Sequence, residues 1–169
     1  MKYLVVVLLL SVSLAGSAQR KSVYPAPVGF VNDFEGDFSK EENLALNAAV
    51  KDFLVKTMDR ELYKGMELAI VTVTDSMFGN EKEMKDYAVK LANKWGVGDK
   101  DNNNGILIAV SRKLRTVYIS TGTGMGTILP NDACQKIIDE RMLPNLKKGK
   151  YYDAILSALS GIEEALGMK

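Results

Sequence analysis

The chain has 169 residues, 47% of them hydrophobic, which suits one globular domain with a sizeable core. It carries 22 Lys and Arg against 21 Asp and Glu, so it lacks the basic excess that is typical of a nucleic-acid-binding protein. One Cys and no His exclude an intramolecular disulfide, a histidine general base and the usual zinc sites, and they leave hard cations bound by oxygen as the metals to consider.

The first residues have the layout of a secretory signal peptide. Lys2 precedes an apolar run from Leu4 to Val12, and small residues follow at Gly16 and Ala18. We therefore assign residues 1–18 to the signal peptide and expect cleavage after Ala18.

The segment LAGS resembles the lipid-attachment signal of bacterial lipoproteins, but Ser17 stands where that signal requires Cys. No later segment offers about 20 consecutive apolar residues, so we expect no permanent membrane anchor in the mature chain. Removal of residues 1–18 takes away Lys2 and no acid, which leaves a net charge of about zero. The sequence predicts a soluble exported protein, periplasmic or extracellular.

Residues 19–38 are rich in Pro, Gly and isolated aromatic residues, and we interpret them as an extended lead-in to a domain at 39–169. The capping box SKEE predicts that a helix begins at Ser39. Apolar residues recur at helical spacing as far as Leu62, and Gly65 is expected to end this helix.

Strands and a second helix are predicted next. Met66–Asp75 is apolar on both faces, as a central strand of a sheet is. An amphipathic helix over Met84–Trp95 is expected to end at Gly96. Ile106–Val110 and Thr116–Ser120 flank a short charged turn and should pair as a hairpin.

Two further helices complete the predicted domain. One starts near Pro130 and is expected to stop before Pro144, and the other has apolar residues at helical spacing from Tyr152 to Leu166. The order of elements predicts a single-domain α/β fold with a small mixed sheet flanked by about four helices.

This topology predicts which loops meet. A right-handed crossover makes the first two predicted strands parallel, and the hairpin makes the third antiparallel to the second. Gly105 should therefore lie near Thr121. The loops Asp99–Gly105 (DKDNNNG) and Gly122–Pro130 (GTGMGTILP) should share one edge of the sheet.

The Asn-rich loop before Ile106–Val110 is the first candidate for a cation site. Asp99, Asp101 and Asn103 have the first, third and fifth spacing of an EF-hand loop, but the Gly and the bidentate Glu that this loop requires are missing. Two interpretations remain. The loop is either a turn, because Asn and Asp tolerate left-handed backbone, or part of an oxygen cage completed from elsewhere.

Three other motifs fail to identify a catalytic nucleophile. GTGMG has neither a Walker lysine nor the dinucleotide spacing, and close backbone approach explains its glycines better. Cys134 has the wrong spacing to Arg141 for a cysteine phosphatase, so we expect a small buried residue. DKD precedes a strand, whereas the DxD motif of aspartate-nucleophile phosphatases follows one. The acids of VNDFEGDFS (Asp33, Glu35 and Asp37) are explained in part by caps and turns.

Five segments together resemble the TPM domain. They are PAPVGFVND (25–33), LAIVTV (68–73), WGVGDKDNNNGILIAVS (95–111), RTVYISTGTGMGTILPND (115–132) and LPNLKKGKYYDAI (143–155). They occur in the family's order and cover nearly all of the predicted mature chain. This family includes a thylakoid-lumen protein of photosystem II repair, a nematode acetylcholine-receptor accessory protein and many exported bacterial proteins.

The resemblance implies a Rossmann-like, three-layer α/β/α sandwich. It also implies a divalent cation, Ca²⁺ or less tightly Mg²⁺, in a depression near acidic loops, with Asp33, Asp99, Asp101 and Asn104 as the metal ligands. Arg115 and Asp132 stand at two further polar positions of the family, and for Arg115 we expect a structural role.

Three hypotheses for function follow. The first is an exported module that binds a divalent cation and assists the assembly or maintenance of an unidentified envelope or membrane protein. The second is a metal-dependent phosphatase that uses the same acidic cleft, because phosphatase activity is attributed to a plant member of the family. The third is a structural module without a ligand, in which the Asn-rich loop is only a turn.

Overall fold

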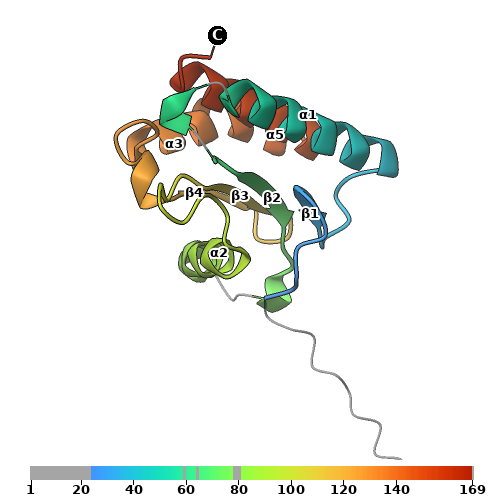
Figure 1. The fold of residues 1–169 in the computed structure, drawn as a ribbon. Helices are drawn as coiled ribbons and strands as arrows, with labels where there is room; N and C mark the ends of the chain where they lie inside the picture. Colours follow the sequence, from blue (N-terminus) through green and yellow to red (C-terminus); the bar gives the residue numbers. More distant parts are fainter. Residues whose placement is uncertain (1–23, 59, 64, 78–80, 169) are drawn as a thin grey trace, which may run out of the picture.

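A four-stranded sheet in the order β1-β2-β3-β4 forms the middle layer of the domain (Figure 1). The computed structural model describes residues 24–58, 60–63, 65–77 and 81–168, and the predicted signal peptide lies outside them. Three strands are parallel and β4 runs antiparallel to β3. The strands are β1 (Val31–Asp33), β2 (Leu68–Thr72), β3 (Ile106–Ser111) and β4 (Thr116–Thr121).

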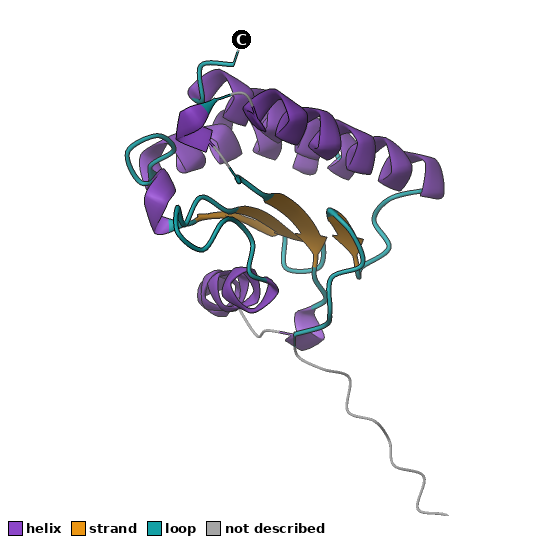
Figure 2. Ribbon diagram, in the orientation of Figure 1, coloured by secondary structure: helices purple, strands orange, loops and turns teal. Residues whose placement is uncertain are grey.

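Helices cover both faces of the sheet, but unequally (Figure 2). One face carries α1 (Lys40–Met58) and α5 (Tyr151–Ala165), with α3 (Asn131–Ile137) and α4 (Leu143–Leu146) packed beside α5. The other face carries α2 (Glu81–Trp95). Each face has its own core, so β2 and β3 are buried along their whole length. The predicted three-layer α/β/α sandwich with a small mixed sheet is confirmed.

Two predicted helix ends are confirmed in detail. At the start of α1, the Glu42 amide donates to Ser39 Oγ at 3.1 Å and the Ser39 amide donates to Glu42 Oε2 at 2.8 Å, which is the expected capping box. At the end of α2, Gly96 has a φ of 66°, a left-handed conformation that suits glycine. Within the described residues, no helix has the length and apolar character needed to cross a bilayer.

The lead-in 19–38 contains a strand that the sequence analysis missed. Val31–Asp33 pairs in parallel with Ile70–Thr72. The strand has only three residues and carries a buried Asn32, so it lacks the run of alternating apolar residues that predicts a strand. The Asn32 side chain is satisfied locally, because it accepts from the Val28 amide and donates to the Gly29 carbonyl.

The predicted end of the first helix was wrong. We expected this helix to run as far as Leu62, but α1 ends at Met58 and a 3₁₀ turn follows at Glu61–Tyr63. The Tyr63 hydroxyl donates to the Leu166 carbonyl at 2.8 Å, at the end of α5. This contact comes from the far end of the chain, so local periodicity could not predict it.

The helix expected to stop before Pro144 continues past it. A π-helical segment, Ile138–Met142, follows α3, and α4 then begins at Leu143. Pro144 therefore lies in the first turn of α4, where the missing amide hydrogen breaks no bond within that helix. The sequence predicted a break because a proline in the interior of a helix would cause one.

The two loops expected to share an edge do meet. The Gly122 amide donates to the Gly105 carbonyl at 2.8 Å, and the Gly124 amide donates to the Asn103 carbonyl at 2.9 Å. A Cβ on Gly124 would lie 1.8 Å from the carbonyl oxygen of Asn102, so only glycine fits there. The prediction that GTGMG serves close backbone approach is confirmed.

Replacing Gly124 tests how tightly the two loops are held. We expect Gly124→Ala to lower the free energy of unfolding by about 2–3 kcal/mol, because the new methyl group must push the Asn-rich loop away. Gly126→Ala is the matched control, since its Cβ would meet only Thr123 O at 3.4 Å. Urea denaturation of both variants measures the difference, and equal stabilities would show that the loops separate without cost.

Candidate functional site

The Asn-rich loop at the amino-terminal edge of β3 is closed by its own side chains. Asp99 Oδ1 accepts from the amides of Asp101 at 3.0 Å and Asn102 at 2.9 Å. Asn104 is buried, and its Oδ1 accepts from the Asp99 amide at 3.0 Å. Two of the predicted ligand atoms therefore already bind backbone amides, as expected of a turn built from Asn and Asp.

Asp33 lies at the opposite edge of the sheet from this loop. It pairs with Thr72 of β2, and Thr72 pairs with Val110 near the end of β3, whereas Asn104 precedes the start of β3. Val110 lies four residue steps along β3 from Ile106, a distance of about 13 Å. The structure therefore does not bring the four predicted ligands together: Asp99, Asp101 and Asn104 share one loop, and Asp33 is separate.

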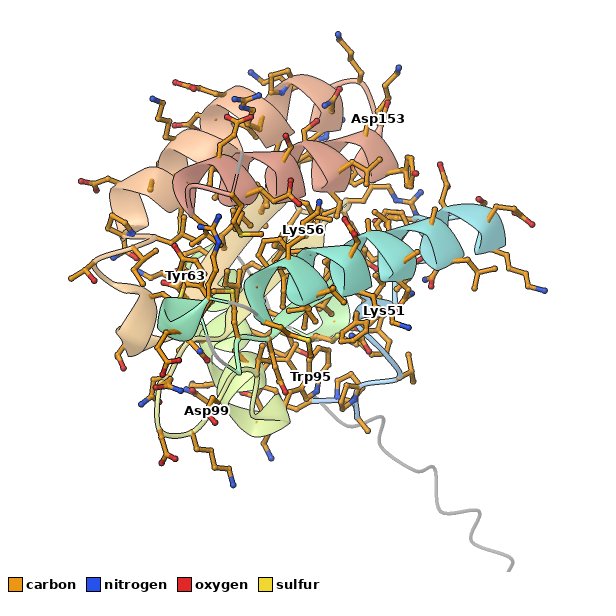
Figure 3. All side chains as sticks on the ribbon, turned by 45° about the horizontal axis from the view of Figure 1, so that its top comes forward. Lys51, Lys56, Tyr63, Trp95, Asp99 and Asp153 are labelled. Carbon is orange, nitrogen blue, oxygen red and sulfur yellow. The ribbon has the colours of Figure 1, made fainter. Side chains whose placement is uncertain are left out.

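In Figure 3, Asp99 lies near Trp95 in the lower part of the view, whereas Asp153, in the first turn of α5, lies near the top. The start of α5 borders the carboxyl-terminal edge of the parallel strands, where Tyr151 and Asp37 line one cleft. In open α/β sheets, ligands bind at this edge.

The Asp33 carboxylate holds the segment between β1 and α1 in place. Its Oδ1 accepts from the amides of Gly36 and Asp37, both at 3.0 Å, and from the Thr72 hydroxyl. Its Oδ2 accepts from the Phe38 amide at 2.9 Å. Three donors bind Oδ1 and one binds Oδ2, so hydrogen bonds within the protein account for the position of Asp33.

Two further acids of this segment reach the turn between β3 and β4. Glu35 Oε2 accepts from the Arg112 amide at 2.6 Å, and Glu35 Oε1 from the Lys113 amide at 3.4 Å. The Arg112 Nε atom lies 2.9 Å from Asp37 Oδ1. The acidic segment and the β3–β4 turn thus form one wall of the carboxyl-terminal edge.

Asp37 is the most unusual group at this edge. Its side chain is 0% exposed, and neither carboxylate oxygen accepts a hydrogen bond from the described residues, although Arg112 forms an ion pair with it. Burial, followed by the nearby Glu35 carboxylate, raises the pKa of Asp37 to about 6. Asp33 adds to the rise and Arg112 acts against it, so the arginine does not compensate for burial and the neighbouring acids.

A cleft of about 740 Å³ opens beside Asp37. It is lined by the end of β3, the start of β4, α4 and the start of α5, and its polar side chains include Arg115, Lys147 and Tyr151. Burial, and then the Asp37 carboxylate, raises the pKa of the Tyr151 hydroxyl. No ion pair joins Arg115 or Lys147 to another described residue, so both cations are available to a ligand.

Only part of this cleft was predicted from the sequence. Glu35 and Asp37 were noted, but Asp33 was singled out, and in the structure Asp33 accepts hydrogen bonds from the backbone amides of its own segment. Arg112, Lys147 and Tyr151 were not selected. The sequence signal that could have indicated this cleft is the acid at every second position, Asp33, Glu35 and Asp37. Three acids so close together are more than helix capping requires.

Cys134 takes no part in either edge. Its side chain is buried at the start of α3, and burial raises the pKa of the thiol to about 11. The prediction of a small buried residue is confirmed, and this thiol is unsuited to act as a nucleophile.

The layers, the sheet order and the cleft define a small α/β/α domain. The TPM domain family matches residues 31–165, which is most of the chain, and the protein belongs to this family. The resemblance proposed from the sequence is thereby confirmed. No curated protein matches the chain.

Solved structures show the same fold. The NMR structure of the N-terminal domain of a P. gingivalis protein is 27% identical, with a TM-score of 0.67 and 82% of each chain covered. The protein BA42 from Bizionia argentinensis is 16% identical, with a TM-score of 0.58 over 80% of this chain and 85% of BA42. The N-terminal domain of cg2496 from Corynebacterium glutamicum is 12% identical, with a TM-score of 0.56 over 81% of this chain and 79% of that domain. At 12% and 16% identity, the likeness supports the fold alone.

Replacing Asp37 by Asn tests the burial of this charge. Because the pKa of Asp37 in the folded state is raised above its ordinary value of 3.8, the folded state binds the extra proton between about pH 4 and 6. Asp37 therefore lowers stability as pH rises through this range, and the cost is complete above about pH 7.

We expect Asp37→Asn to match the wild type at pH 4 and to be more stable at pH 7.5. The open cleft screens the charge, so we expect about 1 kcal/mol, or about 2–4 °C in Tm. Thermal melts at both pH values measure this. A variant that is less stable than the wild type at pH 7.5 would show that the ion pair with Arg112 outweighs burial.

Proposed function

We propose that this TPM domain is an exported binding module that holds a divalent cation at the Glu35–Asp37 pair and assists an envelope protein. The observation that carries the cation site is the buried Asp37 carboxylate, which lines an open cleft while neither oxygen accepts a hydrogen bond from the described residues. A buried acceptor without a donor costs about 1–3 kcal/mol. Arg112 Nε pairs with Oδ1, so a cation in the cleft would supply a partner for Oδ2.

Ca²⁺ and Mg²⁺ suit these groups, because both are hard cations that bind carboxylate and water oxygens. Asp37 would be the ligand that lines the cleft, where water can complete the shell. Glu35 would be the second ligand, and it would bind the cation with the oxygens that also accept from the Arg112 and Lys113 amides. Among the described residues, no set of three His, Cys, Asp or Glu side chains gathers closely enough to hold a metal. We therefore expect weak binding, with a Kd of about 10⁻⁴–10⁻³ M, and weaker binding of Mg²⁺, which demands a more regular shell.

The site predicted from the sequence remains a separate proposal, now confined to the Asn-rich loop. Asp99 Oδ1 and Asn104 Oδ1 accept from backbone amides, whereas the exposed Asp101 carboxylate forms no ion pair with a described residue. Asp33 is not part of this loop. The two proposed cation sites lie at opposite edges of the sheet, so one titration distinguishes them.

A calcium titration followed by amide NMR shifts tests both sites at pH 7.5, on the protein that starts at Gln19. We expect saturable shifts at Gly36, Asp37 and Arg112. Asp37→Asn should weaken binding about tenfold, because it removes one of two charged ligands. The double variant Asp99→Asn, Asp101→Asn is the control.

This control should bind calcium as the wild type does. Shifts confined to residues 99–105 that vanish in the double variant would move the site to the Asn-rich loop. No shift in either segment up to millimolar calcium would overturn both cation proposals.

A metal-dependent phosphatase is the second candidate function, and one observation favours it. Arg115 and Lys147 line the same cleft as the Asp37 carboxyl, and neither forms an ion pair with a described residue. These side chains can bind the charged oxygens of a phosphate monoester beside a cation that stabilises the developing charge.

Hydrolysis of p-nitrophenyl phosphate with added calcium or magnesium tests this candidate. We expect Lys147→Ala to raise KM about tenfold, because it removes a charge-assisted contact to phosphate. Lys148→Ala is the control, since this exposed neighbour does not line the cleft. Turnover that is the same in Lys147→Ala, Asp37→Asn and the wild type would identify a contaminating enzyme.

A further inference from the structure

The two edges of the sheet are protected very differently. At the β1 edge, the outward amide of Val31 donates to Asn47 Oδ1 of α1 at 3.3 Å, so a side chain of the protein covers it. The β1 strand is also only three residues long. The opposite edge is β4, with six residues from Thr116 to Thr121. Long uncovered edge strands readily accept another strand.

The hydrogen-bond pattern shows which groups of β4 face outward. The Gly122 amide donates to the Gly105 carbonyl, and Gly105 and Gly122 are directly opposite each other in the β3–β4 register. Backbone groups alternate along an antiparallel pair, so those of Val117, Ile119 and Thr121 point away from β3. Within the part of the chain that the structure describes, no hydrogen bond is recorded for these outward groups.

A hollow of about 480 Å³ lies along the first half of this edge. It is bounded by β4, by Lys85 of α2 and, on the other layer, by Gln135, Ile138 and Leu143. Figure 1 shows β4 at the border of the sheet, with α2 below it and the α3 segment above it. The edge is therefore open beside Val117 and Tyr118, where flanking side chains can select what binds, whereas Ile119 further along is only 3% exposed.

We propose that β4 binds an extended peptide as a fifth, antiparallel strand, and that the peptide's C-terminal carboxylate pairs with Arg115. Antiparallel pairing makes the added strand run from the level of Thr121 to that of Thr116, so its C-terminus arrives beside Arg115. Arg115 lines this hollow and has no ion pair with a described residue. Its φ of 52° is unusual for a residue with a side chain.

The flanking residues define the chemistry of the peptide. Peptide residues opposite Val117 and Ile119 share their face, which packs on the core beneath α1 and α5 and reaches Ile138, so they should be apolar. Residues opposite Tyr118 face α2, where Lys85 Nζ lies 5.9 Å from the centre of the Tyr118 ring, so they should be acidic. The hollow also contains one acid, Asp139, whose Oδ1 accepts a hydrogen bond from Gln135 Nε2 at 2.9 Å. The favoured partner is an exposed protein C-terminus with alternating acidic and apolar residues that ends in an apolar residue.

Hydrogen exchange with a synthetic peptide tests the proposal. The probe is an acetylated hexapeptide of alternating Glu and Val that ends in Val with a free carboxylate, added to the protein in EDTA to exclude the proposed cation. We expect the amides of Val117, Ile119 and Thr121 to become protected. Those of Tyr118 and Ser120 should change little, because they already bond to β3.

Variants and a modified peptide separate edge pairing from general attraction. The amidated peptide and the Arg115→Ala protein should each weaken binding about tenfold, and combining them should add little, because both remove the same contact. Val117→Pro removes an outward amide on an edge strand and should abolish binding. Lys90→Ala, an exposed lysine of α2 outside the hollow, is the control and should bind as the wild type does.

Three results would overturn the proposal. One is that Arg115→Ala binds both the acid peptide and the amidated peptide as tightly as the wild type binds the acid peptide. Another is protection spread over other surfaces instead of the three outward amides. The third is protection of the β4 edge that grows with protein concentration without peptide, which would assign the edge to a second copy of this chain. Because EDTA removes calcium, these results do not depend on whether the Glu35–Asp37 pair binds a cation, and the two proposals are tested separately.

Discussion

The Asp33 carboxylate is the constraint on which the carboxyl-terminal edge depends. It ends β1 and gathers three successive amides of the following segment together with the Thr72 hydroxyl of β2. These bonds fix the direction of the chain between β1 and α1. Glu35 then accepts from the amides at the start of the β3–β4 turn, and Asp37 forms an ion pair with Arg112 of this turn. An acid that resembles a metal ligand in sequence is thus the scaffold that places two other acids.

This arrangement is costly, which is why it indicates a function. Burial and like charges raise the pKa of Asp37, and its single ion pair with Arg112 does not reverse the rise. An apolar residue at this position would avoid the desolvation of a carboxylate. Groups with perturbed pKa values gather at functional sites, and this one borders a cleft at the edge where α/β sheets bind ligands. The unfavourable burial of the Asp37 charge and its position beside the cleft therefore both favour this edge as the functional site.

The sequence predicted the frame of the fold better than the site. The helix starts, the parallel crossover from β2 to β3 and the meeting of the Asn-rich loop with GTGMG follow from capping, periodicity and handedness, which are local or general rules. The short strand β1 follows from none of these. Its three residues are stabilised by pairing with β2, and its buried Asn32 breaks the apolar pattern.

Missing β1 explains why the predicted ligands do not meet. Because no strand was predicted at Val31–Asp33, its pairing with β2 was unknown. The edge of the sheet at which Asp33 lies could therefore not be derived. Once β1 is seen to run parallel to β2 and β3, Asp33 must lie beside their carboxyl ends, and the loop before β3 must lie at the other edge. The partners of Asp37 come from elements far along the chain, so spacing within the acidic segment could not identify them.

Arg115 connects the two openings on this side of the domain. It is the last residue of the β3–β4 turn that Glu35 and Asp37 hold, it has a left-handed backbone, and it lines both the cleft and the hollow along β4. One positive charge would then serve a carboxylate arriving along β4 and an anion held in the cleft. Binding at the edge strand would therefore influence binding beside Asp37.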